Sequence, residues 1–180
     1  MKNVLIIGAT GTLGSAATQA ILNGTDDKLT LFSRSANRIR ISDSSREKTI
    51  SGNVMNDADL DKAMVGQDAV FAALSGNLGA YAKQIIAAMD RNNVSRLIFI
   101  TSMGIYNEIP ASIGASGNLR SNPVLQTYRD AADEIEASDL NYTIVRPGWF
   151  TSGPVDYEVT RKGEPFGGHD VSVSSIGDIV

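Results

Sequence analysis

The sequence predicts an α/β fold with one doubly wound parallel sheet, in a single domain of 180 residues. Three observations lead to this prediction. Short apolar runs typical of buried strands alternate along the chain with helical patterns. The first of these runs passes directly into a glycine-rich turn and a helix. The composition, 42% hydrophobic, supplies enough apolar side chains for one core.

The first half of the chain supplies three of the predicted strands and two of the helices. The run from Val4 to Ile7 is typical of a strand buried on both faces, and a helix that ends at Gly24 follows it. Asp57 is the expected N-cap of the second helix, because its carboxylate can accept a hydrogen bond from a first-turn N–H. The strands are expected at residues 3–7, 28–33 and 48–52, and the helices at 15–22 and 57–64.

The second half continues the same alternation. Ile85, Ile86 and Met89 recur at the spacing of one helical face, and Pro147 stops the last strand. Strands are expected at residues 68–74, 96–102 and 141–146, and helices at 79–92 and 124–138. In such a sheet the crossovers are right-handed, and ligands bind beyond the carboxyl ends of the strands.

Two segments interrupt the alternation. Residues 103–122 and 148–170 are long, rich in Gly and Pro, and each follows a strand at the ligand edge. We expect them to form the walls of a substrate pocket, with surface disorder as the alternative. Residues 171–180 have the pattern of a strand that leads into a helix of one turn. We expect the natural polypeptide, or its ordered part, to continue from there.

Charge and composition exclude several classes of function. The net charge is −4 and the pI is about 4.9, so no basic face is expected for nucleic acid or an anionic membrane. The absence of cysteine excludes disulfides, thiolate nucleophiles and cysteine-based zinc sites. His169, the only histidine, has no partner motif, so no metal is assigned. No apolar run reaches membrane-spanning length, which favours a cytoplasmic location. The sequence indicates no homo-oligomer and leaves that state open.

The glycine-rich turn carries the main functional signal. Gly8, Gly11 and Gly14 are spaced G-x-x-G-x-x-G between the first strand and the first helix. Glycine lets the backbone approach a pyrophosphate, whose charge is met by free N–H groups and the positive end of the helix dipole. The pattern therefore predicts a dinucleotide site, and the alternative is a structural turn that binds nothing. The expected contacts also include Thr10, Thr12 and Leu13.

The end of the second strand indicates which dinucleotide binds. An NAD site has an Asp or Glu there for the ribose 2′-hydroxyl. This chain has Ser33 and Arg34 instead, with Arg38 one helical turn later. A guanidinium can bind a 2′-phosphate through two hydrogen bonds, whereas a carboxylate would repel it. The sequence therefore predicts NADP(H) over NAD(H), the alternative being that Arg34 is a solvated surface cation.

The ends of the later strands complete the predicted cofactor site. Asn53 and Val54 follow the third strand and are expected near the adenine ring. Small residues at the end of the fourth strand permit close approach to the ribose and pyrophosphate, and the fifth strand ends beside the expected nicotinamide position. The residues at these ends are Ala73, Leu74, Ser75 and Gly76 for the fourth strand, and Thr101 and Ser102 for the fifth.

Together these motifs and the stretch from Tyr142 to Gly148 resemble the short-chain dehydrogenase/reductase superfamily. The resemblance is greatest to its atypical, NmrA-like NAD(P)-binding branch, which includes relatives of NAD-dependent epimerases and dehydratases. It covers nearly the whole chain. It implies a Rossmann fold, NADP(H) binding and hydride transfer to a carbonyl, a quinone or a flavin-like acceptor.

The sequence departs from that superfamily at the proton donor. Enzymes with full carbonyl chemistry use a Tyr-x-x-x-Lys pair, in which the lysine lowers the pKa of the tyrosine. The resemblance places Arg129 at the lysine position and Leu125 at the tyrosine position. Tyr128 lies nearby, but Ala132 follows it after four residues. Arg129 can hydrogen-bond the nicotinamide ribose, yet it cannot act as an acid near neutral pH.

Other polar and aromatic residues remain as candidates at the substrate side. Ser102 matches the superfamily serine that orients a substrate oxygen, with a backbone-satisfying hydroxyl as the alternative. Tyr106 follows in the loop and could reach the pocket, although packing within the loop is the alternative. Pro147, Gly148 and Trp149 are expected to contact the cofactor, and Trp149 with Phe150 to cover its nicotinamide side as an apolar wall.

The sequence therefore favours an NADPH-dependent reductase of a small or planar acceptor. A flavin or quinone suits a site without a strong acid, because the reduced product can take its proton from water. The alternative is a non-catalytic redox sensor that binds NADP(H) and regulates a partner protein. An epimerase or dehydratase of nucleotide sugars ranks last, because the chain has no room for a separate substrate lobe.

Overall fold

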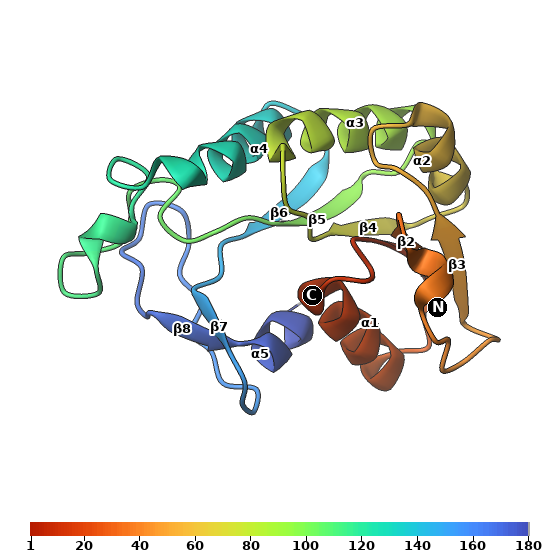
Figure 1. The fold of residues 1–180 in the computed structure, drawn as a ribbon, viewed down its shortest axis with the longest axis horizontal. Helices are drawn as coiled ribbons and strands as arrows, with labels where there is room; N and C mark the ends of the chain where they lie inside the picture. The colour runs from red at the N-terminus through yellow and green to blue at the C-terminus, as the bar shows by residue number, and fades with distance from the viewer. Residues whose placement is uncertain (180) are drawn as a thin grey trace.

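The computed structural model describes residues 1–179 and contains one six-stranded parallel sheet with helices on both faces (Figure 1). The strand order is β3-β2-β1-β4-β5-β6, so the direction of strand addition reverses between β1 and β4. The strands are β1 (Asn3–Ile7), β2 (Lys28–Ser33), β3 (Glu47–Ser51), β4 (Ala69–Ala72), β5 (Arg96–Ile100) and β6 (Asn141–Val145). The predicted doubly wound parallel sheet in a single domain is confirmed.

The helices divide the core between the two faces of the sheet. The longer helices are α1 (Thr12–Gly24), α2 (Asp57–Met64), α3 (Leu78–Arg91) and α4 (Gln126–Glu136), and α5 (Val173–Asp178) is short. In Figure 1, α2, α3 and α4 cover one face, and α1 with α5 covers the other. Leu5 and Ile7 of β1 pack with the first group, while Ile6 between them packs beside α1. This alternation explains why the apolar run is continuous.

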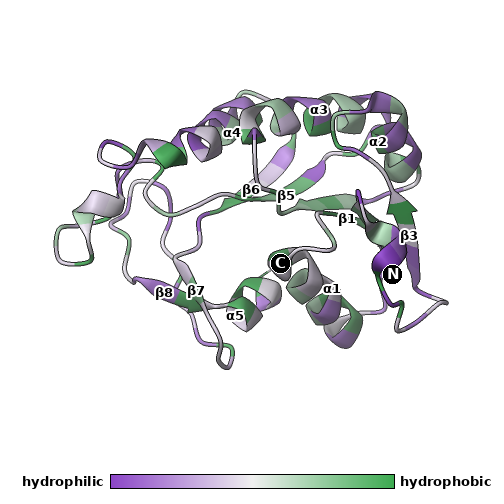
Figure 2. Ribbon diagram, viewed as in Figure 1, coloured by the Kyte–Doolittle hydropathy of each residue, from purple (hydrophilic) through white to green (hydrophobic). Residues whose placement is uncertain are grey.

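Side chains on both faces of the central strands are almost completely buried. Phe32, Phe71 and Phe99 are the largest of them. Figure 2 shows apolar residues along the strands and on the inward faces of the helices. Among the described residues, none of the helices is long and apolar enough to cross a membrane.

The boundaries of several elements differ from the prediction. The first helix begins at Thr12, three residues earlier than expected, because its first turn includes the end of the glycine motif, with Gly11 as the N-cap residue. Asn56, not Asp57, caps α2: its side-chain oxygen accepts the N–H of Asp59 at 3.0 Å. Before α4, residues 123–125 form a 3-10 turn. Each difference lies at an element end, where side-chain contacts decide between neighbouring residues.

A second, two-stranded sheet lies outside the predicted pattern. It pairs β7 (Trp149–Thr151) with β8 (Asp170–Ser172) in parallel. Gly148 permits this pairing, because a Cβ there would lie 2.4 Å from the carbonyl oxygen of His169. The expected strand and short helix at 171–180 correspond to β8 and α5, and Val180 lies outside the described residues.

Candidate dinucleotide-binding site

The glycine-rich turn joins β1 to α1 where the sheet order reverses. Gly8 has a φ of +88°, and a Cβ on it would lie 2.0 Å from the carbonyl oxygen of Ala73. A Cβ on Gly14 would lie 2.2 Å from the carbonyl oxygen of Gly8. Backbone therefore fills the space that a side chain would take, so the turn itself requires both glycines. Gly11 has more room, since its Cβ would lie 3.3 Å from the same oxygen.

The start of α1 is open to an anion. Gly11 is its N-cap residue without a side-chain hydrogen bond, and the first turn contains no acidic residue. The first N–H groups of the helix thus lack a capping side chain, and its positive end has no local countercharge. Thr10 and Thr12 are exposed here, whereas Leu13 packs into the core and offers only its backbone. A pyrophosphate is the kind of group that such a helix start binds.

A pocket of about 430 Å³ lies beside this helix start. Thr10 lines it from the glycine-rich turn and Ser15 from α1, and Ser35, Arg38 and Arg40 line it from the segment after β2. The structure thus places two guanidinium groups and several hydroxyl groups next to the glycine-rich turn. This is the donor set that a phosphate on the adenosine ribose would need.

Only some of the residues predicted at the end of β2 reach this pocket. Arg38 lines it, but Arg34 is exposed and is not among the lining residues. The Ser33 hydroxyl accepts the backbone N–H of Ser35 at 3.2 Å. Arg40 was missed by the sequence analysis, although it stands only two residues after Arg38 and could have been included with it.

The residues after β3 and β4 lie at the same edge of the sheet. The Asn53 side chain accepts the N–H of Met55 at 3.0 Å, while Val54 is buried in the core. Ala73 donates its N–H to the carbonyl oxygen of Ile7 at 3.1 Å, which holds the turn after β4 against the glycine-rich turn. The rest of that turn, Leu74, Ser75 and Gly76, is partly or fully exposed.

After β5, the two predicted hydroxyl residues have different surroundings. Thr101 is buried, and its N–H and hydroxyl both donate to the carbonyl oxygen of Val145, at 2.8 and 3.0 Å. Its side chain therefore joins β5 to β6. Ser102, the next residue, is partly exposed at the edge of the sheet.

Tyr106 lies at the centre of a charged cluster that joins three parts of the chain. Its ring centroid lies 4.8 Å from the Arg129 guanidinium carbon, 5.2 Å from that of Arg146 and 4.4 Å from the Lys162 nitrogen. Its hydroxyl donates to Glu136 at 2.5 Å. Burial raises the pKa of Tyr106, and the hydrogen bond to Glu136 and the charge of that carboxylate raise it further. Tyr106 and Arg129 are therefore neighbours, but the phenol proton is held by Glu136.

We expect Tyr106→Phe to lower the free energy of unfolding by about 1 kcal/mol above roughly pH 5, and by less in acid. Burial alone would raise the pKa of Glu136, but hydrogen bonds from Lys162 and Tyr106 outweigh it and hold this pKa below its ordinary value. A lowered carboxylate pKa stabilises the fold above the unfolded pKa, about 4.3, and this stability is lost as pH falls. Urea unfolding between about pH 3 and 8 measures the effect. If the difference in unfolding free energy between the wild type and Tyr106→Phe stays constant with pH, the proposed link to Glu136 is wrong.

A buried ion pair organises the loop after β5. The Glu108 carboxylate accepts the N–H groups of Gly104 and Tyr106, at 3.0 and 2.9 Å, and pairs with Arg146 Nη1 at 2.8 Å. The two charged side chains are only 6% and 9% exposed. The sequence analysis named neither residue for this role, because a contact across 38 residues has no local signal.

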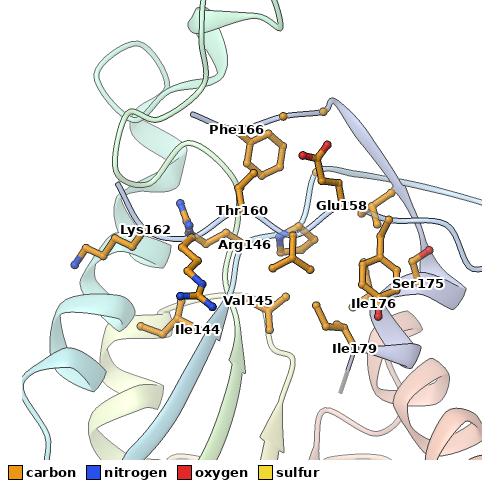
Figure 3. A pocket seen from close by; sticks show the side chains of 18 of the residues that line it. Ile144, Val145, Arg146, Glu158, Thr160, Lys162, Phe166, Ser175, Ile176 and Ile179 are labelled. Atoms are coloured by element: carbon orange, nitrogen blue, oxygen red, sulfur yellow. The ribbon is translucent and has the colours of Figure 1, made fainter. Parts of the chain in front are cut away.

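A larger pocket of about 700 Å³ opens beside β6 (Figure 3). Its walls come from β6, α5 and the segment 157–168, with Ile144, Ile176 and Phe166 among the apolar residues. Predicted site residues that line it are Tyr106, Pro147 and Gly148. It includes residues of both long loops but none of the glycine-rich turn, so its volume alone does not make it the acceptor site.

Trp149 does not line this pocket. It lies on β7 with 64% of its surface exposed, and its N–H donates to the carbonyl oxygen of His169 at 2.9 Å. Within residues 1–179, no group of three or more His, Cys, Asp or Glu side chains is arranged to hold a metal ion.

The strand order and the glycine-rich turn at its reversal define a Rossmann-type dinucleotide-binding fold. A model of the NAD(P)H-binding family matches residues 8–180. The chain belongs to this family.

Solved structures agree with this assignment. A Rossmann-fold NAD(P)-binding family protein from Shigella flexneri is 40% identical, with a TM-score of 0.83 over 99% of this chain and 84% of that one. A wide-type short-chain dehydrogenase/reductase from Veillonella parvula, in complex with NADP, is 27% identical, with a TM-score of 0.89 and the same coverage. An anaerobillin reductase from Escherichia coli, 16% identical, shares the fold, with a TM-score of 0.77 over 97% of this chain and 86% of that one. The chain thus has an NAD(P)H-binding, oxidoreductase-like fold.

Proposed function

We propose that the protein binds NADP(H) and uses NADPH to reduce a small or planar acceptor. The observation that carries the proposed NADP(H) binding is the start of α1, which has no capping side chain. It follows a turn in which backbone atoms occupy the positions where Cβ atoms on Gly8 and Gly14 would lie. The open backbone and the uncompensated helix dipole fit a pyrophosphate. The complex of the related Veillonella protein with NADP supports the same ligand.

The phosphorylated cofactor is proposed from the pocket beside the turn. Arg38 and Arg40 meet Thr10 there, so a ribose 2′-phosphate would find two guanidinium groups and a hydroxyl. Arg34 is exposed outside this lining, four residues before Arg38, and adds positive charge to the segment after β2. The pocket also contains the Glu47 carboxylate, but Ser42 and Asp43 already donate three hydrogen bonds to it, at 2.7 to 2.9 Å.

The chemistry proposed for the site divides between cofactor and protein. When bound, reduced nicotinamide supplies a hydride. The residues of this chain would bind and orient it: the turn after β4 along the ribose and pyrophosphate, and Arg129 at the nicotinamide ribose. Ser102 would hydrogen-bond the acceptor oxygen. The acceptor's proton would come from water, because the phenol of Tyr106 is occupied by Glu136.

The second candidate is a redox sensor that binds NADP(H) without turnover. The observation that favours it is Leu125, which stands at the position of the superfamily tyrosine. Leucine has a hydrocarbon side chain with no acidic proton to give, and here it is buried with Ile105 and Ala132. A sensor would bind oxidised and reduced cofactor with different affinities and turn over no acceptor.

The experiment that tests the cofactor is a titration with NADPH, NADP+, NADH and NAD+, followed by nucleotide fluorescence. We expect the phosphorylated pair to bind more tightly. Arg38→Ala should weaken NADPH about 10- to 100-fold and leave NADH within about twofold, because one charge-assisted contact is worth about 1.5–3 kcal/mol. Arg34→Ala should weaken NADPH less, because Arg34 lies outside the pocket lining. The control is Arg96→Ala, at the start of β5 and so at the opposite edge of the sheet.

Two results would contradict this assignment. Equal affinity for NADPH and NADH would mean that the pocket does not recognise the 2′-phosphate. If none of the four nucleotides binds, the glycine-rich turn has only a structural role. If NADPH binds, a panel of quinones, flavins and carbonyl compounds separates the two candidates. A reductase should oxidise NADPH with some member of the panel and should be slowed by Ser102→Ala, whereas a sensor should show no turnover.

A further inference from the structure

A threonine from α4 is bonded to the turn between β4 and α3. Thr127 Oγ1 donates to the carbonyl oxygen of Gly76 at 2.8 Å and accepts the N–H of Leu78 at 2.8 Å. One hydroxyl thus satisfies both sides of the turn, from about 50 residues away along the chain. Thr127 was not singled out by the sequence analysis.

The same turn is held from its other side by the glycine-rich turn. Ala73 donates to Ile7, and its carbonyl oxygen occupies the space that a side chain on Gly8 would fill. Gly76 has a φ of +120°, so the chain changes direction sharply at the residue that Thr127 contacts. The turn therefore lies between the proposed pyrophosphate site and α4 and is hydrogen-bonded on both sides.

Helix α4 also carries Arg129, the residue proposed to bind the nicotinamide ribose, two residues after Thr127. Figure 1 shows α3 and α4 side by side on one face of the sheet. They approach each other closely at Gly79, where a Cβ would lie 2.9 Å from the Cβ of Asp130. The separation between the turn and Arg129 is thus set by this packing and by the hydroxyl of Thr127.

We propose that Thr127 is a positioning residue for NADP(H). Its hydroxyl fixes the backbone from Leu74 to Asn77 at the place where that backbone meets the nicotinamide half of the cofactor, and at a set distance from Arg129. The inference rests on the proposed function, because it needs the cofactor to lie across this turn. In a sheet of this order, β4 belongs to the half that binds the second mononucleotide, so the adenosine half does not depend on Thr127.

The test compares Thr127→Val, which keeps the shape and loses both hydrogen bonds, with Thr127→Ser, which keeps the hydroxyl. The chain offers a matched control in Thr25→Val. Thr25 Oγ1 also donates to a carbonyl oxygen, that of Ile21 at 2.9 Å, and accepts an N–H, that of Asp27 at 3.0 Å. It lies after the last residue of α1, at the edge of the sheet opposite the site. For each variant, urea unfolding and the affinities for NADPH and for 2′,5′-ADP, the adenosine half, are measured.

We expect Thr127→Val to weaken NADPH about 10-fold and 2′,5′-ADP less than about twofold. Thr127→Ser should restore NADPH affinity, and Thr25→Val should lose similar stability without losing affinity. The proposal is overturned if Thr127→Val binds NADPH like the wild type, if it loses both ligands equally, or if Thr25→Val loses as much. If the wild type binds none of the nicotinamide nucleotides, the proposed function fails, and the role of Thr127 fails with it.

Discussion

Replacing Gly14 with alanine should abolish detectable NADPH binding and lower the free energy of unfolding by about 3 kcal/mol, the upper end of the usual cost of overpacking. The new Cβ would lie 2.2 Å from the carbonyl oxygen and 2.8 Å from the carbonyl carbon of Gly8, and 2.9 Å from the Cα of Ala9. These are backbone atoms of the turn, so no side-chain rotation can relieve the contact. The turn must open, and its N–H groups then lose their common direction toward a pyrophosphate.

The control for Gly14→Ala is Gly24→Ala, on the same helix. Nothing lies within 4 Å of a Cβ at Gly24, and its φ is not positive. Alanine there should leave NADPH affinity unchanged and should leave stability unchanged or raise it by up to about 1 kcal/mol. Urea unfolding and the nucleotide titration measure both variants under conditions where circular dichroism shows them folded. If Gly14→Ala folds and binds NADPH with normal affinity, the glycine-rich turn does not bind the cofactor as proposed.

The elements that the sequence predicted correctly are those with a strong local pattern. The run from Val4 to Ile7 can only be buried on both faces, because it contains no polar residue to turn toward water. The glycine-rich turn is equally local, since strand, glycines and helix follow one another within 14 residues. The alternation of strands and helices then predicted a parallel sheet with right-handed crossovers, whereas the strand order itself comes from the structure.

The features that were not predicted depend on contacts between distant segments. Glu136 and Tyr106 are 30 residues apart, and nothing near either residue indicates the other. β7 is three residues long and exists because β8, about 20 residues later, pairs with it. At the start of α2 the expected cap was Asp57, but the structure has the preceding residue, Asn56, in that role. Local patterns therefore placed the frame of the site but not its bonded network.

Glu108→Gln should lower the free energy of unfolding by about 3 kcal/mol, within the range found when a buried ion pair loses one partner. Arg146 would remain 9% exposed and charged without its carboxylate. The new amide would also direct an NH2 group toward donors, since the Gly104 and Tyr106 N–H groups and the Arg146 guanidinium all donate to Glu108. At least one of these donors would then lack an acceptor, at a cost of about 1–3 kcal/mol.

The same substitution at an exposed pair provides the control. Glu134 pairs with Lys83 at 3.3 Å, with side chains 38% and 65% exposed, so Glu134→Gln should cost less than about 1 kcal/mol. A double variant, Glu108→Gln with Arg146→Met, should cost less than the sum of its two single variants, because the second change removes the charge that the first left unpaired. Urea unfolding of the four proteins in this cycle measures the coupling. If Glu108→Gln costs no more than Glu134→Gln, the pair does not hold the loop after β5, and the positions of Ser102 and Tyr106 must depend on the packing of Ile105 instead.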